Sequence, residues 1–394
     1  MIPQKGGAGM RQFFDEFKAF FRKGDLVLLM LCLGTSIFGA VMIASTTNYR
    51  GSAQYVIIHL AAAALGVLLY MTISSIDVDV FHENRIWIVL FNTFLLLLLI
   101  PFGTDHGSGN RSWLVFPFLP VDIQPAEICK ITYILIMASV MTSRRSQISH
   151  IKSVIEMVFH LMLLAGLNMA LSSDLGVTLI FVFIFIVMAF TGGVNIFWFA
   201  LAAGAVVVLA PIVWNSGILA EHQMERLEVL WNPELDPMGV DARFHSVRSL
   251  KSLTGGGFFG QGLFNGIRTQ GGELFAQHTD FIFSAIGEEL GFLGCTFVLA
   301  MLGLIVWRCI AIGRRSPDYP RRLVCFGAAA ALTFQILINV GMCIGIMPVI
   351  GLTLPFISYG GSSVVSLYAM LGLVSGVCAR PEAPTHERYI RHYA

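Results

Sequence analysis

The chain has 394 residues, of which 56% are hydrophobic and only 12% are charged, and its formal net charge is +1. Because soluble domains carry about twice that share of charged residues, the composition excludes an ordinary soluble enzyme and indicates a protein embedded in lipid. The small net charge and the lack of long basic runs argue against a nucleic-acid-binding protein.

Ten apolar segments are long enough to cross a bilayer, which takes about 20 mostly apolar residues. The sequence therefore predicts an all-α polytopic membrane protein with about ten transmembrane helices. In chain order the predicted spans are 26–45, 53–74, 86–103, 124–142, 153–171, 175–191, 194–215, 279–307, 323–346 and 355–379.

Lysine and arginine residues predict the orientation, because short cytoplasmic loops carry an excess of positive charge. The two tails and the short loops on their side are basic, whereas the short loops opposite hold only Arg50 and Arg111. Both termini are therefore predicted to be cytoplasmic. The predicted organisation is a cytoplasmic amphipathic tail (1–25), helices one to seven (26–215), an extracellular loop (216–278), helices eight to ten (279–379) and a cytoplasmic tail (380–394).

The long loop between helices seven and eight is too long for a mere connector and too short for an independent domain. It opens with an amphipathic stretch, Leu219–Trp231, that predicts a short interfacial helix. Four basic residues follow, and their side chains could bind a pyrophosphate, because arginine forks match phosphate oxygens. They surround the glycine-rich run 254–262, and they are Arg243, Arg248, Lys251 and Arg268. The alternative is an ordinary solvated loop surface.

Ionisable residues at the predicted fourth helix are candidates for function, because charged groups are costly in lipid. Glu127 and Lys130 are three residues apart, so they share one face of the helix and can partly neutralise each other. Two interpretations stay open: an ion pair that fixes helix packing, or one polar wall of a cavity.

The strongest candidate for chemistry is Asp280, in the run His278-Thr279-Asp280 where the long loop meets the membrane. Burial raises the pKa of such a carboxyl group, which suits a general base acting on a sugar hydroxyl. The alternative is a helix N-cap at Thr279 or Asp280. Glu288 and Glu289, further along the same helix, are expected to pair with polar neighbours inside the bundle.

The segment 351–363 combines a proline and three glycines with polar residues that include Ser358. Such a run in an apolar span predicts bent or unwound backbone, which lies only against protein or a water-filled cavity. Close helix packing through small residues is the other interpretation.

Four runs, in order along the chain, resemble the SEDS family (shape, elongation, division and sporulation). They are 110–113 (Asn-Arg-Ser-Trp), 124–127 (Gln-Pro-Ala-Glu), 278–291 and 354–363, and the resemblance extends from about Gly24 to Ala379. The sequence departs from the family pattern in the loop, at 244–249, 266–270 and 275–277.

This resemblance implies a ten-helix peptidoglycan glycosyltransferase of the bacterial cytoplasmic membrane, acting in elongation, division or sporulation. It would join lipid II units into β-1,4 glycan strands with inversion, beside a class B penicillin-binding protein. Asp280 matches the essential aspartate of the family, which makes it the expected general base. The expected substrate or cavity residues are Glu127, Lys130, Arg111, Arg243, Arg248, Lys251, His278 and Ser358.

Two other functions compete with the polymerase. One is a flippase of a lipid-linked cell-wall precursor, and the other is a non-catalytic scaffold of the division or elongation machinery. No cofactor is expected with certainty, and a divalent cation is left open at Asp280, Glu288 and Glu289, whose spacing matches no recognised metal site. The expected partners are lipid II, the penicillin-binding protein and membrane lipid, and no nucleic acid.

Overall fold

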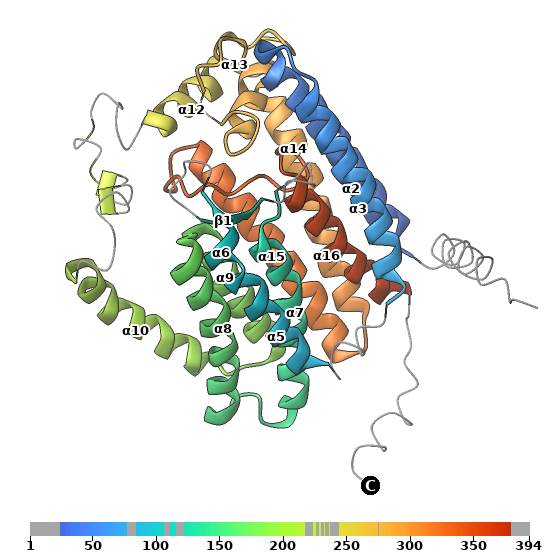
Figure 1. Ribbon diagram of the computed structural model, residues 1–394, viewed down its shortest axis with the longest axis vertical. Helices are drawn as coiled ribbons and strands as arrows, with labels where there is room; N and C mark the ends of the chain where they lie inside the picture. Colours follow the sequence, from blue (N-terminus) through green and yellow to red (C-terminus); the bar gives the residue numbers. More distant parts are fainter. Residues whose placement is uncertain are drawn as a thin grey trace, which may run out of the picture.

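A computed structural model describes residues 24–76, 84–105, 111–115, 122–216, 244–274 and 276–379, with 224–225, 228–229, 232 and 236. Within these residues nine helices are long and apolar enough to cross a membrane, and a tenth is apolar over Ile196–Ile212. Most of their axes run along the long axis of the molecule (Figure 1). The helices are α2 (Leu26–Thr47), α3 (Gln54–Ser74), α5 (Arg85–Leu97) with α6 (Leu99–Phe102), α7 (Pro125–Ser143), α8 (Ile151–Ser172), α9 (Leu175–Gly192), α10 (Ile196–Asn215), α14 (Ile282–Arg315), α15 (Tyr319–Cys343) and α16 (Gly361–Ala379).

Each of the ten predicted spans corresponds to one of these helices, which confirms the all-α polytopic class. The bounds of the last three predicted spans were wrong. The eighth helix begins at Ile282 rather than at 279 and continues to Arg315. The ninth helix begins at Tyr319, four residues before its predicted start. The last helix begins only at Gly361, because the backbone before it makes an irregular turn with a positive φ at Gly351 and Phe356.

Polar contacts of Asp25, near the start of the described chain, mark one end of the bundle. The Asp25 side chain caps α2 by accepting from the amide of Leu28. Its own amide donates to Ser375 near the end of α16, and its carboxylate pairs with Arg308 of α14 at 2.8 Å. The beginning of α2 and the end of α16 therefore lie on one side, called here the terminal side; the opposite side, which carries α12 and α13, is the loop side.

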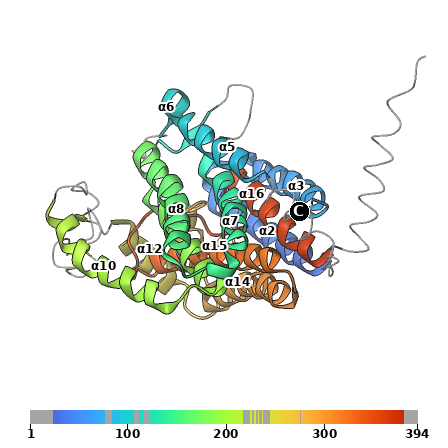
Figure 2. The same cartoon turned by 90° about the horizontal axis from the view of Figure 1, so that it is seen from below.

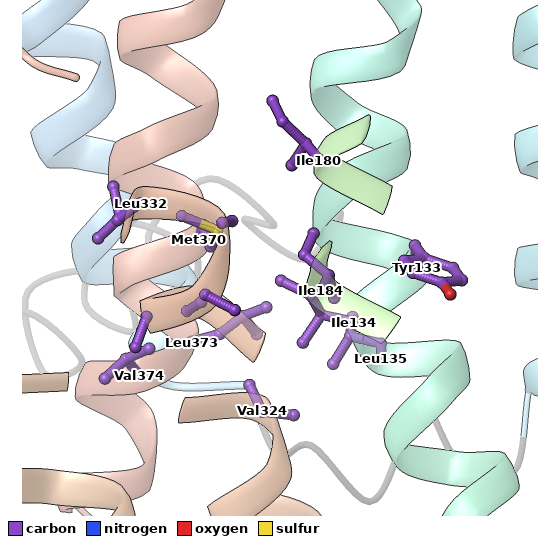
Figure 3. Close-up of a cluster of buried hydrophobic side chains, with 14 of the residues drawn as sticks. Tyr133, Ile134, Leu135, Ile180, Ile184, Val324, Leu332, Met370, Leu373 and Val374 are labelled. Carbon is purple, nitrogen blue, oxygen red and sulfur yellow. The ribbon is translucent and has the colours of Figure 1, made fainter. Parts of the chain in front are cut away.

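The core lies where α7, α9, α15 and α16 meet. Figure 3 shows its buried side chains, which include Tyr133, Ile134, Leu135, Ile180, Ile184, Val324, Leu332, Met370, Leu373 and Val374. In lipid such helices associate through close packing rather than through release of water. Small residues make that possible: a Cβ at Gly66 of α3 would lie 2.5 Å from the ring of Tyr368 on α16.

Helix α10 differs from the others because it projects away from the bundle (Figure 2), and its residues from Leu201 to Ile212 are exposed. On the loop side, α12 (Phe244–Gly255) and α13 (Ile267–Gly271) lie over the end of α14 (Figure 1). A short antiparallel pair, β1 (Gly103–Thr104) and β2 (Trp113–Leu114), lies against α6. Residues 1–23 of the predicted amphipathic tail (1–25) and most of the predicted helix at 219–231 fall outside the described residues.

Helix α14 is interrupted at Gly291, whose φ of 67° and ψ of −161° are not helical. Only glycine adopts this conformation readily, because it has no Cβ. The interruption divides α14 into a short segment of nine residues on the loop side, Ile282–Leu290, and a longer one, Phe292–Arg315. The short segment begins two residues after Asp280, so its placement decides where that carboxylate lies.

Candidate active site

Asp280 lies in the turn that leads into α14. The amides of Thr279 and Phe281 both donate to the carbonyl of Ala276, which closes this turn. The N-cap residue of α14 is Phe281, and no side chain caps the helix, so the interpretation of Asp280 or Thr279 as an N-cap was wrong. The Asp280 carbonyl accepts from Asn339 of α15 at 2.8 Å. These hydrogen bonds fix the backbone of Asp280 and do not involve its carboxylate.

The Asp280 carboxylate is partly buried, and none of the residues that the structure describes forms a hydrogen bond or an ion pair with it. Gly351 lies beside it, so close that a Cβ there would be 3.7 Å from Oδ2. Burial, and to a lesser degree the negative charge of Asp174, raises the pKa of Asp280 to about 6. A carboxylate with this pKa is mostly ionised at pH 7 and remains basic enough to accept a proton.

Ser358 fixes the turn that carries Asp280. Its hydroxyl donates to the carbonyl of Thr279 at 2.6 Å and accepts from the amide of Leu354 at 2.8 Å. The amide of Tyr359 also donates to the carbonyl of His278 at 2.8 Å. The segment before α16 is therefore held to the turn before α14, and the single Ser358 proton is used in that contact.

His278 lies among aromatic rings next to this turn. Its ring meets the ring of Tyr55 edge to face at a centroid distance of 5.0 Å, and that of Tyr359 at 5.8 Å. Burial, together with the positive charge of Arg50, lowers the pKa of His278 to about 4. Its imidazole is therefore neutral at pH 7. Its Nδ1 is buried and has no partner among the described residues.

Glu127 and Lys130 form the ion pair expected from their spacing, at 2.8 Å. The other carboxylate oxygen of Glu127 accepts from Ser366 of α16 at 2.7 Å. Both charged side chains are buried, so the pair joins α7 to α16. This geometry supports the interpretation as a packing contact.

Asp174 is an acidic residue that the sequence analysis did not single out. It caps α9 through the amide of Val177, and its second oxygen accepts from Gln124 at 3.2 Å and from Ser112 at 3.5 Å. Burial is the main cause that raises the pKa of Asp174. A serine-aspartate pair at the start of a strongly apolar helix was the available signal, because an acid at the rim of lipid is a functional candidate.

None of the basic loop residues that the structure describes forms an ion pair with Asp280. Arg248 donates to the carbonyl of Glu273, and its guanidinium lies 4.1 Å above the Phe244 ring. Arg268 donates to the carbonyl of Lys251 and lies 3.6 Å from Glu288. The Lys251 and Arg111 side chains are exposed, and Arg243 falls outside the described residues.

Glu288 and Glu289 pair with polar neighbours as expected, but most of these neighbours belong to the loop and not to the interior of the bundle. Glu288 accepts from the amides of Arg268 and Thr269, at 3.0 and 2.9 Å, at the beginning of α13. Glu289 accepts from Ser45 of α2 and from Gln270. These contacts direct both carboxylates into the loop, and no cluster of three or more metal-ligating side chains occurs within the described part of the chain.

Comparison with known proteins gives one consistent result. The family model for FtsW, RodA and SpoVE, described as "Cell cycle protein", matches residues 25–382. The probable peptidoglycan glycosyltransferase FtsW of Trichlorobacter lovleyi is 31% identical, over 90% of this chain and 93% of that protein. The stage V sporulation protein E of Bacillus subtilis is 30% identical, over 90% and 97%.

Two solved structures share the fold. The rod shape determining protein RodA of Thermus thermophilus superposes with a TM-score of 0.68 at 26% identity, over 91% of this chain and 98% of that one. A chain of a peptidoglycan synthase complex that coordinates polymerization and crosslinking gives a TM-score of 0.77 at 28% identity, over 90% and 97%.

Proposed function

This chain belongs to the FtsW/RodA/SpoVE family of cell cycle proteins, the SEDS family, and on that premise we propose a glycosyl transfer in which Asp280 is the general base. The protein is a multi-pass peptidoglycan glycosyltransferase of the bacterial cytoplasmic membrane, of the division and sporulation type. The observation that carries the proposed mechanism is the Asp280 carboxylate, which is partly buried, free of partners among the described residues and raised in pKa to about 6.

The proposed reaction joins two lipid II molecules. The 4-hydroxyl of the acceptor sugar attacks the anomeric carbon of the donor sugar, and Asp280 takes the hydroxyl proton as the new C–O bond forms. The bond from the anomeric carbon to the lipid pyrophosphate breaks, and the pyrophosphate leaves with the electron pair. A single displacement from the opposite face converts an α-linked donor into a β-1,4 link. One carboxylate is enough, because pyrophosphate needs little protonation to leave.

Basic residues of the loop side are proposed to stabilise the charge on the leaving pyrophosphate. Arg111 and Lys251 are exposed and therefore accessible to a ligand. Arg248 could contribute by exchanging its contact with the Glu273 carbonyl for one with phosphate. Arg243 keeps the same proposed role and falls outside the described residues.

We further propose that the chain works with a class B penicillin-binding protein and with both termini in the cytoplasm. The similarity to a chain of a peptidoglycan synthase complex supports the partner. The basic residues at the terminal side, among them Arg144, Arg145, Arg314 and Arg315, support the orientation.

The test is polymerisation of purified lipid II by the full-length protein with its penicillin-binding partner. Asp280→Asn keeps the size of the side chain and removes its basicity, so we expect glycan synthesis to fall about 100- to 10,000-fold. Glu273→Gln, which neutralises an exposed acid of the same loop, is the matched control and should keep full activity. Equal strand formation by wild type and Asp280→Asn would show that Asp280 is not the base.

A further inference from the structure

The interruption of α14 is filled by the turn 256–262, which we call the glycine turn. At Gly291 the helix loses its own hydrogen bonds, and the glycine turn supplies substitutes in both directions. Two amides of the turn donate to α14 carbonyls, and two α14 amides donate to carbonyls of the turn. The four bonds are Gln261 to Glu288 (2.9 Å), Gly262 to Glu289 (2.9 Å), Phe292 to Gly257 (2.9 Å) and Leu293 to Phe258 (3.3 Å).

Contact between bare backbones makes this arrangement possible. A Cβ at Gly256 would lie 1.8 Å from the carbonyl oxygen of Gly287, and one at Gly260 would lie 2.2 Å from that of Glu289. A Cβ at Gly291 would in turn lie 2.4 Å from the amide nitrogen of Gly260. The glycine-rich run therefore packs its backbone directly against α14.

Two polar contacts between α2 and α14 give the height of the glycine turn relative to a bilayer. Asp25 pairs with Arg308 on the terminal side, and Ser45 donates to Glu289 on the loop side. Ser45 follows Asp25 by 20 positions and Arg308 follows Glu289 by 19, with no charged residue between them on either helix. At about 1.5 Å per helical residue these contacts are about 30 Å apart, which is the thickness of a hydrocarbon core. Glu289, and with it the glycine turn, marks the loop-side boundary.

Large aromatic side chains project from the turn at this boundary. The exposed fractions are 55% for Phe258, 77% for Phe259 and 60% for Phe292 of α14. Phe258 stacks on Phe292 at 5.7 Å, so the turn continues the lipid-facing surface of the helix. Burial of such side chains away from water is favourable.

We propose that the glycine turn is an interfacial anchor that inserts Phe258 and Phe259 into the bilayer leaflet on the loop side. The reciprocal hydrogen bonds favour lipid as the occupant, because irregular backbone tolerates hydrocarbon only where its polar groups are paired. The anchor also sets the height of the catalytic turn. The segment Ile282–Leu290 extends from the boundary by nine residues, roughly 14 Å along its axis at 1.5 Å per residue.

The experiment measures the depth of single labelled positions in the full-length protein, in nanodiscs that contain no other protein. The exposed Cys378 is first replaced by serine, and Phe259→Cys and Lys251→Cys are then each labelled with a small fluorophore. Lys251 is the matched control, because it is exposed in α12 of the same loop. Quenching by spin-labelled lipid and by aqueous iodide is compared. Phe258→Cys serves as the second position if Phe259→Cys does not fold.

We expect lipid to quench the Phe259 label several-fold more than the Lys251 label, and iodide to show the opposite order. Equal iodide quenching of the two labels would overturn the proposal. So would protection of the Phe259 label that appears only after a penicillin-binding partner is added, because that result would make the turn a protein interface.

Discussion

The hydroxyl of Ser358 donates a hydrogen bond of 2.6 Å to the carbonyl of Thr279, the residue that precedes Asp280. These two residues are 79 positions apart, and the contact joins the turn before α16 to the turn before α14. Because both Ser358 and its acceptor belong to irregular backbone, the bond replaces pairing that a regular helix would provide. The orientation of the candidate base therefore depends on the segment before the last helix.

Ser358→Ala is expected to lower glycan synthesis several-fold and the free energy of unfolding by about 1–3 kcal/mol, because it leaves the Leu354 amide and the Thr279 carbonyl without their partner. The measurement pairs a polymerisation assay with thermal unfolding in detergent. Ser143→Ala is the control, since among the described residues the Ser143 side chain bonds only to the carbonyl of Ser139 in its own helix. Unchanged activity in Ser358→Ala would contradict the proposed dependence.

Glycan synthesis should depend on pH through Asp280. The base must be ionised, and burial raises its pKa to about 6, so the rate should be high above pH 6 and fall as the pH drops through that value. The profile of kcat/KM against pH is the measurement. A profile that stays flat between pH 5 and 7 would rule out Asp280 as the titrating base.

Asp174→Asn should move that acidic limb to lower pH. The negative charge of Asp174 contributes to the raised pKa of Asp280, so its removal lowers the Asp280 pKa, by about one unit or less because burial is the larger cause. Asparagine also caps helices well, which preserves the start of α9. Glu273→Gln should leave the profile in place, and a shift of the limb to higher pH in Asp174→Asn would have the wrong sign.

The buried pair of Glu127 and Lys130 should show strong coupling. Glu127→Gln or Lys130→Met alone is expected to destabilise the protein by about 3–5 kcal/mol, because each leaves an uncompensated buried charge. The double variant should recover most of that loss. The exposed pair of Arg144 and Glu156 provides the comparison, and Arg144→Gln should cost about 1 kcal/mol or less. Additive losses in the double variant, measured by thermal unfolding, would contradict the coupling.

Gly256→Ala should disrupt the attachment of the glycine turn to α14. The new methyl group would lie 1.8 Å from the Gly287 carbonyl oxygen, so one backbone must move, at a cost of about 1–3 kcal/mol. Gly303→Ala is the control and should not lower stability, because a Cβ there would have no described atom within 4 Å apart from its chain neighbours and the backbone of its own helix. Equal melting temperatures of the two variants would show that the turn is not fixed to the helix.

The sequence by itself determined the ten apolar helices, because the need to pair every backbone group in lipid leaves the helix as the solution for each long apolar segment. It also singled out Asp280 as the candidate base and predicted the pairing of Glu127 with Lys130, since residues three apart on a helix are neighbours. These features follow from local periodicity and from the cost of charge in lipid.

Only the tertiary structure decided how Asp280 is held. The link from Ser358 to Thr279, the charge of Asp174 on Asp280 and the glycine turn against α14 each join residues from distant parts of the chain. The interruption at Gly291 could not be read from hydropathy, because a glycine within an apolar run is compatible with both a continuous and a broken helix. Backbone partners from the loop favour the break, and such partners are known only once the chain is folded.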